Sequence, residues 1–117
     1  MELVYEGRST DQGRISHMGM KVHVLYGKPT DPAAFEEYYR SIHAPLAEKL
    51  PGLQSFEYGK GTPNADGSDP AYFWVATLSF ADAAALGTAM GGPEGQAAAE
   101  DVPKFASGGV TVVVSEF

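Results

Sequence analysis

The chain has 117 residues, of which 44% are hydrophobic and 20% are charged, and this length fits one domain. Its formal charge of -7, with no cluster of Lys or Arg, argues against nucleic acid or an anionic membrane surface as a partner. The absence of cysteine excludes disulfides, a thiolate nucleophile and metal ligation by sulfur. No apolar run approaches the roughly 18 residues of a membrane span and no signal peptide opens the chain, so we expect a cytoplasmic protein.

The first part of the chain differs from the rest. Residues 1–19 are polar and rich in glycine, and the run 16–19 before Met20 is typical of a cloning remnant. We therefore predict a tag or a disordered N-terminal extension over 1–19 and a single domain over 20–117. A short extra strand over 2–5 stays open as an alternative, because its composition permits extended structure.

Four segments have the composition and alternation of β-strands. They cover residues 21–26, 53–60, 71–80 and 110–114. The turn-rich segment 61–70 joins the second and third strands into a hairpin. The third strand is interpreted as apolar on both faces, with Trp74 on one face and Phe73 and Val75 on the other, so that neither face suits water.

A helix is expected to follow the first strand. It begins near Pro32, where Thr30 or Asp31 can cap it. Spacings of three and four residues predict a buried stripe of Phe35, Tyr38, Tyr39, Ile42 and Leu46. Because Pro45 cannot donate to the carbonyl four residues earlier, the helix should kink or loosen beside His43.

The second helical region is rich in alanine. It covers 81–90 and resumes over 94–99 or beyond after a break at 91–93. The order β-α-β-β-α-β predicts an α+β, ferredoxin-like fold, with a four-stranded antiparallel sheet and both helices on one face. Because the other face is uncovered in a monomer, we expect a homodimer in which these sheet faces stack.

One segment resembles a known family. Residues 35–46 read F-x-x-Y-Y-x-x-x-H-x-P-L, and Pro51-Gly52-Leu53 and an aromatic strand follow. In this pattern, in the opening K-V-x-V-L-Y strand and in residues 101–105 (DVPKF), the chain from Met20 onward resembles the EthD family of the dimeric α+β barrel superfamily. The resemblance implies a ferredoxin-like protomer that pairs with a second copy to form a dimeric α+β barrel.

The resemblance also bears on function. EthD proteins take their name from a gene cluster for degrading ethyl tert-butyl ether, and similar proteins are assigned to oxidoreductase or small-molecule metabolism. Superfamily relatives include cofactor-free monooxygenases, polyketide cyclases, muconolactone isomerases and haem-dependent enzymes. The architecture alone therefore leaves the chemistry open.

His43 is the main candidate for catalysis, and it falls at the histidine position of the family pattern. An imidazole can take a proton from a phenol, a carbon acid or a lactone near neutral pH. Tyr39 lies one helical turn earlier, where its hydroxyl can orient a substrate oxygen or hydrogen-bond the imidazole. In the structural alternative, His43 bonds a backbone carbonyl freed by Pro45 and only fixes the kink.

Aromatic side chains are expected to wall a pocket for a small apolar or aromatic ligand. The candidates are Tyr26, Phe35, Phe56, Tyr58 and Trp74. His23 is interpreted as structural, facing either the dimer interface or solvent, because it has no evident acid or base partner. No metal site and no cofactor are expected, since the histidines lack ligand spacing, and haem binding through His43 has no support in the sequence.

The sequence therefore predicts an EthD-like, cofactor-independent enzyme of oxidoreductase, isomerase or cyclase type. It acts on a small apolar or aromatic metabolite, with His43 as acid or base and Tyr39 as hydrogen-bond donor. The alternative is a non-catalytic binding or accessory protein for an oxidative degradation system.

Overall fold

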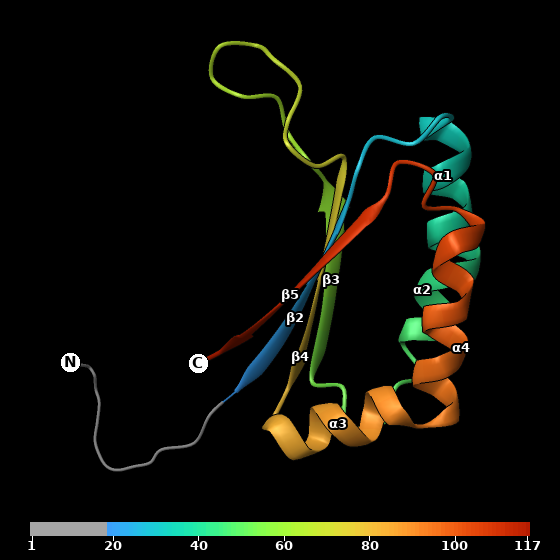
Figure 1. Ribbon diagram of the computed structural model, residues 1–117, viewed down its shortest axis with the longest axis vertical. Coiled ribbons are helices and arrows are strands. Elements are labelled where there is room, and N and C mark those ends of the chain that lie inside the picture. The colour runs from blue at the N-terminus through green and yellow to red at the C-terminus, as the bar shows by residue number, and fades with distance from the viewer. Residues whose placement is uncertain (1–18) are drawn as a thin grey trace, which may run out of the picture.

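The computed structural model describes residues 19–117. The predicted tag or extension, Gly19 apart, and the alternative strand over 2–5 lie outside the described residues. Figure 1 shows two layers, a twisted sheet and a set of helices that covers one of its faces. The strands are β2 (Met20–Tyr26), β3 (Ser55–Lys60), β4 (Trp74–Phe80) and β5 (Val110–Glu116), in the order β3-β4-β2-β5. All three pairings are antiparallel, which confirms the predicted α+β ferredoxin-like fold.

The inner strand β4 has one buried and one half-buried face. Its helix-facing side is wholly buried and comprises Trp74, Ala76, Leu78 and Phe80. The other side carries Val75, Thr77 and Ser79, so the prediction of a strand that is apolar on both faces is wrong for its second half. The chain bends before Trp74, so Phe73 leaves the alternation and packs edge-on against Phe35 of the helical layer, at 5.4 Å between ring centroids.

The first helical region contains a π-helical turn. α1 (Pro32–Tyr38) begins behind Asp31, whose side chain accepts a hydrogen bond from the Ala34 backbone N–H at 3.1 Å. The π-helical segment η1 (Tyr39–His43) follows, in which the Ala44 N–H donates to the Tyr39 carbonyl five residues earlier, and α2 (Ala44–Ala47) completes the region. The helix loosens ahead of Pro45 as predicted, and it does so through one residue inserted in the helical repeat.

This insertion changes which side chains face the sheet. Ile42 was predicted on the buried stripe, but 46% of its surface is exposed, so that prediction is wrong. The extra residue rotates the following side chains by about 100°, which turns His43 and Ala44 toward the sheet instead. Tyr38 and Leu46 are only half-buried.

The second helical region is two helices with a sharp break. α3 (Ala83–Gly91) is capped by Asp82, which accepts from the Ala85 N–H at 2.8 Å. α4 (Pro93–Asp101) follows and ends in the short helix η2 (Val102–Lys104). In the described part of the chain, no helix is long and apolar enough to cross a membrane.

Two hydrophobic clusters fill the space between sheet and helices. The first is aromatic and is built from Tyr26, Phe35, Tyr39, Ala44, Trp74, Ala76 and Phe105. The second is aliphatic apart from Phe80 and contains Val22, Ala47, Leu50, Leu78, Phe80 and Ala89. Residues from both clusters line a cavity between the sheet and the helices.

Candidate functional site

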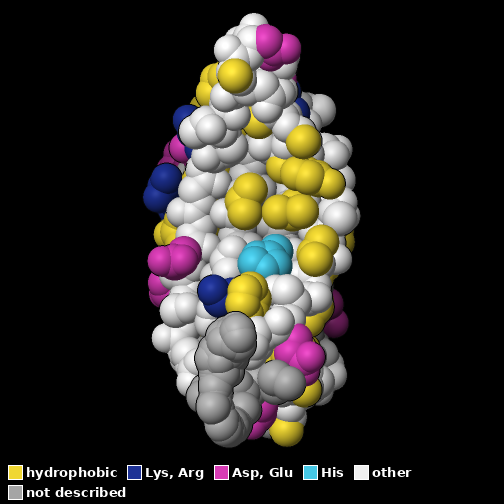
Figure 2. All heavy atoms as spheres, turned by 90° about the vertical axis from the view of Figure 1, so that its left-hand side faces the viewer, with side chains coloured by type: hydrophobic (Ala, Val, Ile, Leu, Met, Phe, Trp, Pro, Cys, Tyr) yellow, Lys and Arg dark blue, Asp and Glu magenta, His cyan; other side chains and the backbone are white. Residues whose placement is uncertain are grey.

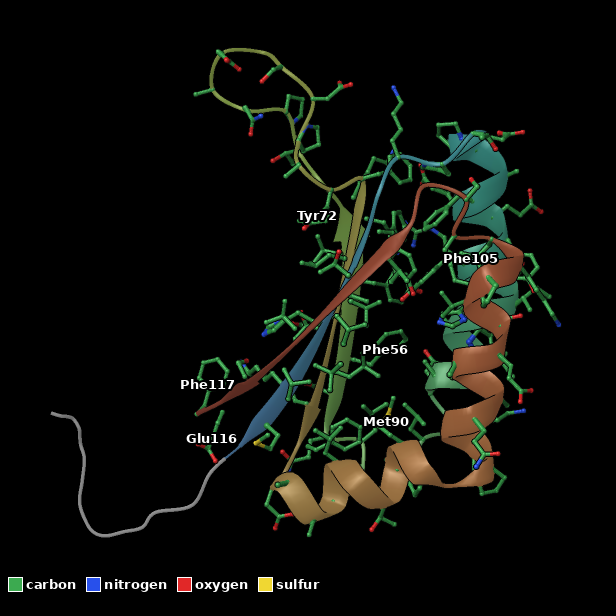
Figure 3. The ribbon with its side chains drawn as sticks, viewed as in Figure 1. Phe56, Tyr72, Met90, Phe105, Glu116 and Phe117 are labelled. Carbon is green, nitrogen blue, oxygen red and sulfur yellow. The ribbon has the colours of Figure 1, made fainter. Side chains whose placement is uncertain are left out.

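A cavity of about 270 Å³ lies between the sheet and the helices. Figure 3 shows Phe56 of β3 and Met90 of α3 pointing into this space. Its lining is almost wholly apolar, and its polar members are Tyr26, Tyr39 and His43. The remaining lining residues are Val22, Val24, Ala47, Leu50, Phe56, Ala76, Leu78, Met90, Ala98, Ala99, Val102, Val110 and Val112. The volume suits a small molecule, near the lower end of the range of ligand pockets.

His43 is paired with a buried carboxylate. Its Nδ1 lies 2.9 Å from Oδ2 of Asp101, which is the last residue of α4, and both side chains are buried. The second carboxylate oxygen, Oδ1, accepts a hydrogen bond from the Tyr38 hydroxyl at 2.6 Å. The partner of Nδ1 is thus a carboxylate and not the backbone carbonyl that the structural alternative invoked.

The protonation state of His43 follows from this environment. Burial lowers the pKa of the imidazole below its usual 6.5, and the hydrogen bond and negative charge of Asp101 oppose this effect without overcoming it. His43 is therefore neutral at pH 7, and its Nδ1 carries the proton because only an N–H can donate to a carboxylate. Nε2 is left as a lone-pair acceptor, and within the described residues it has no hydrogen-bond partner.

Two buried tyrosines complete the polar part of the cavity. Burial raises the pKa of the Tyr39 hydroxyl and of the Tyr26 hydroxyl well above the usual value of 10. Both hydroxyls therefore stay protonated and can donate hydrogen bonds. The Tyr39 ring lies 5.1 Å from the His43 ring and 5.8 Å from the Tyr26 ring, measured between centroids. Tyr39 contacts the imidazole through its ring, and the structure records no hydrogen bond between the two described side chains.

The cavity brings some of the predicted site residues together and leaves others out. His43, Tyr39, Tyr26 and Phe56 line it. Phe35, Tyr58 and Trp74 do not line it, and they pack behind it around the Tyr39 ring at centroid distances of 5.0–6.0 Å. Their position supports the tyrosine without direct access to a ligand. The functional roles of all seven residues remain predictions.

His23 lies on the opposite face of the sheet. Its Nδ1 is 3.2 Å from the Thr77 hydroxyl on β4, and its Nε2 is 3.0 Å from the Ser115 hydroxyl on β5. Both ring nitrogens are thus engaged with neighbouring strands. This arrangement agrees with the interpretation of His23 as a structural residue.

Asp101 and Tyr38 are the site residues that the sequence analysis did not single out. Asp101 belongs to the D-V-P-K-F segment that carries part of the family resemblance, and it ends a helix whose buried side is otherwise Gly95 and Ala98. A carboxylate on that apolar side requires a buried partner, which is the signal that could have linked it to His43. Tyr38 was assigned to the core, whereas its hydroxyl donates a hydrogen bond to the Asp101 carboxylate.

The chain belongs to the EthD domain family, whose model matches residues 27–109. It is 44% identical over 96 residues to an uncharacterized 11.0 kDa protein from the thcB-thcC intergenic region of Rhodococcus erythropolis. The matched residues cover 82% of this chain and 92% of that protein. It is also similar to the crystal structure of an EthD family protein from Bacillus halodurans. That comparison has 31% identity and a TM-score of 0.79, over 85% of this chain and 98% of the other.

More distant solved structures share the fold alone. One is described as a dimeric ferredoxin-like protein of unknown function from Thermobifida fusca, with 17% identity and a TM-score of 0.63 over 86% of this chain and 91% of that one. Another is a variant of SnoaB, a cofactor-independent oxygenase from Streptomyces nogalater. It has 19% identity and a TM-score of 0.56 over 87% and 92% of the two chains.

Proposed function

We propose that this protein is a cofactor-independent enzyme in which His43 removes a proton from a small apolar or aromatic metabolite. The observation that carries the proposal is the His43–Asp101 pair, which leaves Nε2 as a base at the wall of an apolar cavity. Neutral imidazoles held by a carboxylate through Nδ1 are suited to general base catalysis. The cofactor-independent oxygenase among proteins of the same fold is consistent with this chemistry.

The cavity limits the substrate class. Apolar side chains such as Leu50, Leu78 and Phe56 make up most of its wall, and its volume is about 270 Å³. A molecule that fits there is small and largely apolar, with its polar atoms directed at the histidine and the two tyrosines. A phenol, a quinol or a small ketone with an acidic C–H has these properties, whereas a large planar cofactor such as haem does not suit this volume.

The proton step uses groups that the site already holds in the required states. His43 Nε2 accepts the proton, and Asp101 stabilises the imidazolium that forms. A hydroxyl of the Tyr39–Tyr26 pair donates to the oxygen on which negative charge develops, because burial keeps both tyrosines protonated. Whether the anion then reacts with oxygen, isomerises or cyclises depends on the substrate.

A binding or accessory protein is the second candidate, and the same apolar cavity favours it. In that case His43 and the tyrosines hold a ligand oxygen without chemistry. The two candidates differ in what His43→Gln does, because glutamine can still form hydrogen bonds but cannot act as a base near neutral pH.

The test is a ligand screen by thermal shift followed by turnover assays, with phenols, quinols, lactones and small ketones as probes. Ala98 is buried at the cavity wall, so Ala98→Leu should fill the cavity and abolish stabilisation by a hit, while Ala97→Leu on the exposed side of the same helix should not. For an enzyme, His43→Gln retains binding and lowers turnover by about 100-fold or more. Binding of a hit with no turnover under any condition, or full turnover in His43→Gln, contradicts the enzyme proposal.

We also propose that the protein works as a homodimer through the sheet face that carries no helices. Figure 2 shows this face, where hydrophobic side chains gather over one half beside a histidine. On this face Leu25 lies between Val75 of β4 and Thr111 of β5, and all three are incompletely buried. A second copy can cover this surface, in keeping with relatives of the same fold that are described as dimeric.

A further inference from the structure

The imidazole of His43 contacts two aromatic rings. The ring centroids of Phe105 and Tyr39 lie 4.8 Å and 5.1 Å from the centroid of the His43 ring, and 5.8 Å from each other. All three side chains are buried, with 5% of the surface exposed for His43 and 8% for Phe105. The hydrogen bond to Asp101 fixes the edge of the imidazole at Nδ1. Close packing of the two rings restricts rotation of the imidazole about that bond.

One short segment brings both the carboxylate and the phenyl ring to the histidine. Asp101 ends α4, and Phe105 follows four residues later, after the single turn of η2. The N–H groups of Phe105 and Ala106 both donate to the Val102 carbonyl, at 3.2 Å and 3.0 Å, which closes this turn. Figure 3 shows Phe105 where the chain leaves the helical layer beyond α4. The turn therefore sets the position of the phenyl ring relative to the carboxylate.

Phe105 also lines a second hollow, with a volume of about 240 Å³. This hollow shares no lining residue with the ligand cavity, and Phe35 and Tyr38 form part of its wall. It is open to solvent, because its other polar lining residues are exposed. These are Thr30, Asp31, Lys104 and Ser107. Of the described aromatic residues around the hollow, Phe105 alone has its ring beside that of His43.

The groups that face His43 show why access of water matters there. Asp101 is the charged side chain in contact with it. The other titratable side chains around the pair are Tyr26 on β2, Tyr38 on α1, Tyr39 on η1 and the exposed Lys104 on η2. Burial lowers the pKa of His43 against the opposing effect of Asp101. Water beside the ring would hydrate the imidazolium and weaken this effect, so a side chain that excludes water favours an unprotonated Nε2.

We propose that Phe105 is a positioning residue for His43, which separates the imidazole from the solvent-open hollow and holds the ring so that Nε2 is directed at the ligand cavity. The inference rests on the proposed role of His43 as a base. Phe105 does not line the ligand cavity, so it acts on the reaction through the histidine and not through the substrate. It keeps water away from the base and limits the orientations that the ring can adopt.

Paired substitutions of two phenylalanines test this role. Phe105→Ala removes the ring beside His43, and Phe35→Ala removes a ring from the same hollow and the same aromatic cluster. Phe35 is a matched control because it is 3% exposed and its ring lies 5.3 Å from that of Phe105, whereas within the described residues no ring contact joins it to His43. If an alanine variant does not fold, Phe105→Val and Phe35→Val retain part of the volume and give the same comparison.

Two NMR measurements report on His43 in the protein without a ligand. Proton NMR follows exchange of the Nδ1 proton with water, and nitrogen-15 NMR follows the pKa of the ring. In Phe105→Ala we expect the Nδ1 proton to exchange at least about tenfold faster than in wild type, because water enters from the hollow. We expect the pKa of His43 to rise toward its usual 6.5, because water hydrates the imidazolium. Phe35→Ala should leave both quantities close to those of wild type.

Turnover provides a third measurement once the ligand screen yields a substrate. In Phe105→Ala, kcat should fall by about tenfold or more while KM stays nearly constant, because Phe105 contacts the base and not the ligand. A fall in kcat of the same size in Phe35→Ala would show that the effect comes from the aromatic cluster as a whole, which contradicts the proposal.

Three NMR results overturn the proposal: exchange and pKa in Phe105→Ala that equal those of wild type, equal changes in Phe35→Ala, and a pKa that falls in Phe105→Ala. The last would mean that the phenyl ring stabilises the imidazolium instead of keeping water away from it. Neither NMR measurement requires a ligand, so both are independent of whether His43 is a base. Expected NMR results together with no turnover of any probe would contradict the enzyme proposal and still support Phe105 as the residue that shields His43 from water.

Discussion

Nδ1 of His43 lies 2.9 Å from Oδ2 of Asp101, although 58 positions separate the two residues in the sequence. The π-helical turn directs the histidine toward the sheet, and the end of α4 supplies the carboxylate. The pair fixes the proton on Nδ1, so Nε2 keeps a lone pair that can accept a proton or a hydrogen bond from a ligand in the cavity. The proposed acid-base function depends on that tautomer.

Asp101→Asn tests the tautomer directly. The amide keeps the shape of the carboxylate, but it can donate its N–H to Nδ1 and so move the histidine proton to Nε2, which removes the base. We expect turnover of a substrate found by the screen to fall by about 100-fold or more. We expect stability to fall by about 1–3 kcal/mol, because a buried polar pair is disturbed. Steady-state kinetics and urea unfolding measure both effects, and unchanged turnover would show that Asp101 does not set the state of His43.

Tyr38→Phe tests the outer member of the same chain of contacts. It removes the hydrogen bond to Oδ1 of Asp101, at a cost of about 1 kcal/mol or less, because the half-buried site allows water to replace the hydroxyl. With one donor fewer, the carboxylate attracts the imidazolium more strongly, which raises the pKa of His43. The acid limb of the pH–rate profile should therefore shift to higher pH, and a profile that does not move would reduce Tyr38 to a packing residue.

The lowered pKa of His43 makes stability dependent on pH. Below the usual value of 6.5 the unfolded chain takes up a proton at this position that the folded chain resists until its own, lower pKa is reached. The stability that His43 contributes is therefore full above pH 6.5 and is lost as the pH falls below it. The midpoint temperature of thermal unfolding should fall more steeply from pH 7 to pH 5 in wild type than in His43→Gln. Midpoint temperatures that fall in parallel in the two proteins would contradict the lowered pKa of His43.

Alanine substitutions at two glycines test the packing of α3 against α4, which positions α4. A Cβ at Gly95 would lie 2.6 Å from the Met90 Cα, so Gly95→Ala should separate α3 from α4 and destabilise the fold by about 1–3 kcal/mol. Gly87 in α3 has open space around it, so Gly87→Ala should stabilise by up to about 1 kcal/mol through helix propensity. Chemical denaturation of both variants measures the contrast. Equal changes in the free energy of unfolding for the two variants would show that α3 and α4 tolerate a methyl group at Gly95.

The sequence predicted the order of strands and helices because alternation and the spacing of three and four residues are local properties. It misplaced Ile42 because a regular repeat of 3.6 residues contains no inserted position, and the inserted residue of η1 is what exposes Ile42 and buries His43. His43 and Tyr39 were identified from one helix and its family pattern. Asp101 was missed because its contact with His43 arises only when α4 packs against the first helical region.

The central claim is that His43 presents an unprotonated Nε2 to a ligand in the cavity. Nitrogen-15 NMR of the imidazoles at pH 7, assigned by comparison with His43→Gln, measures the protonation of each ring nitrogen and its response to 4-methylphenol. The account predicts a protonated Nδ1 and an unprotonated Nε2 whose resonance moves on addition of the phenol in wild type but not in Ala98→Leu. A proton on Nε2 in the free protein, or a phenol that binds without moving the Nε2 resonance, would contradict it.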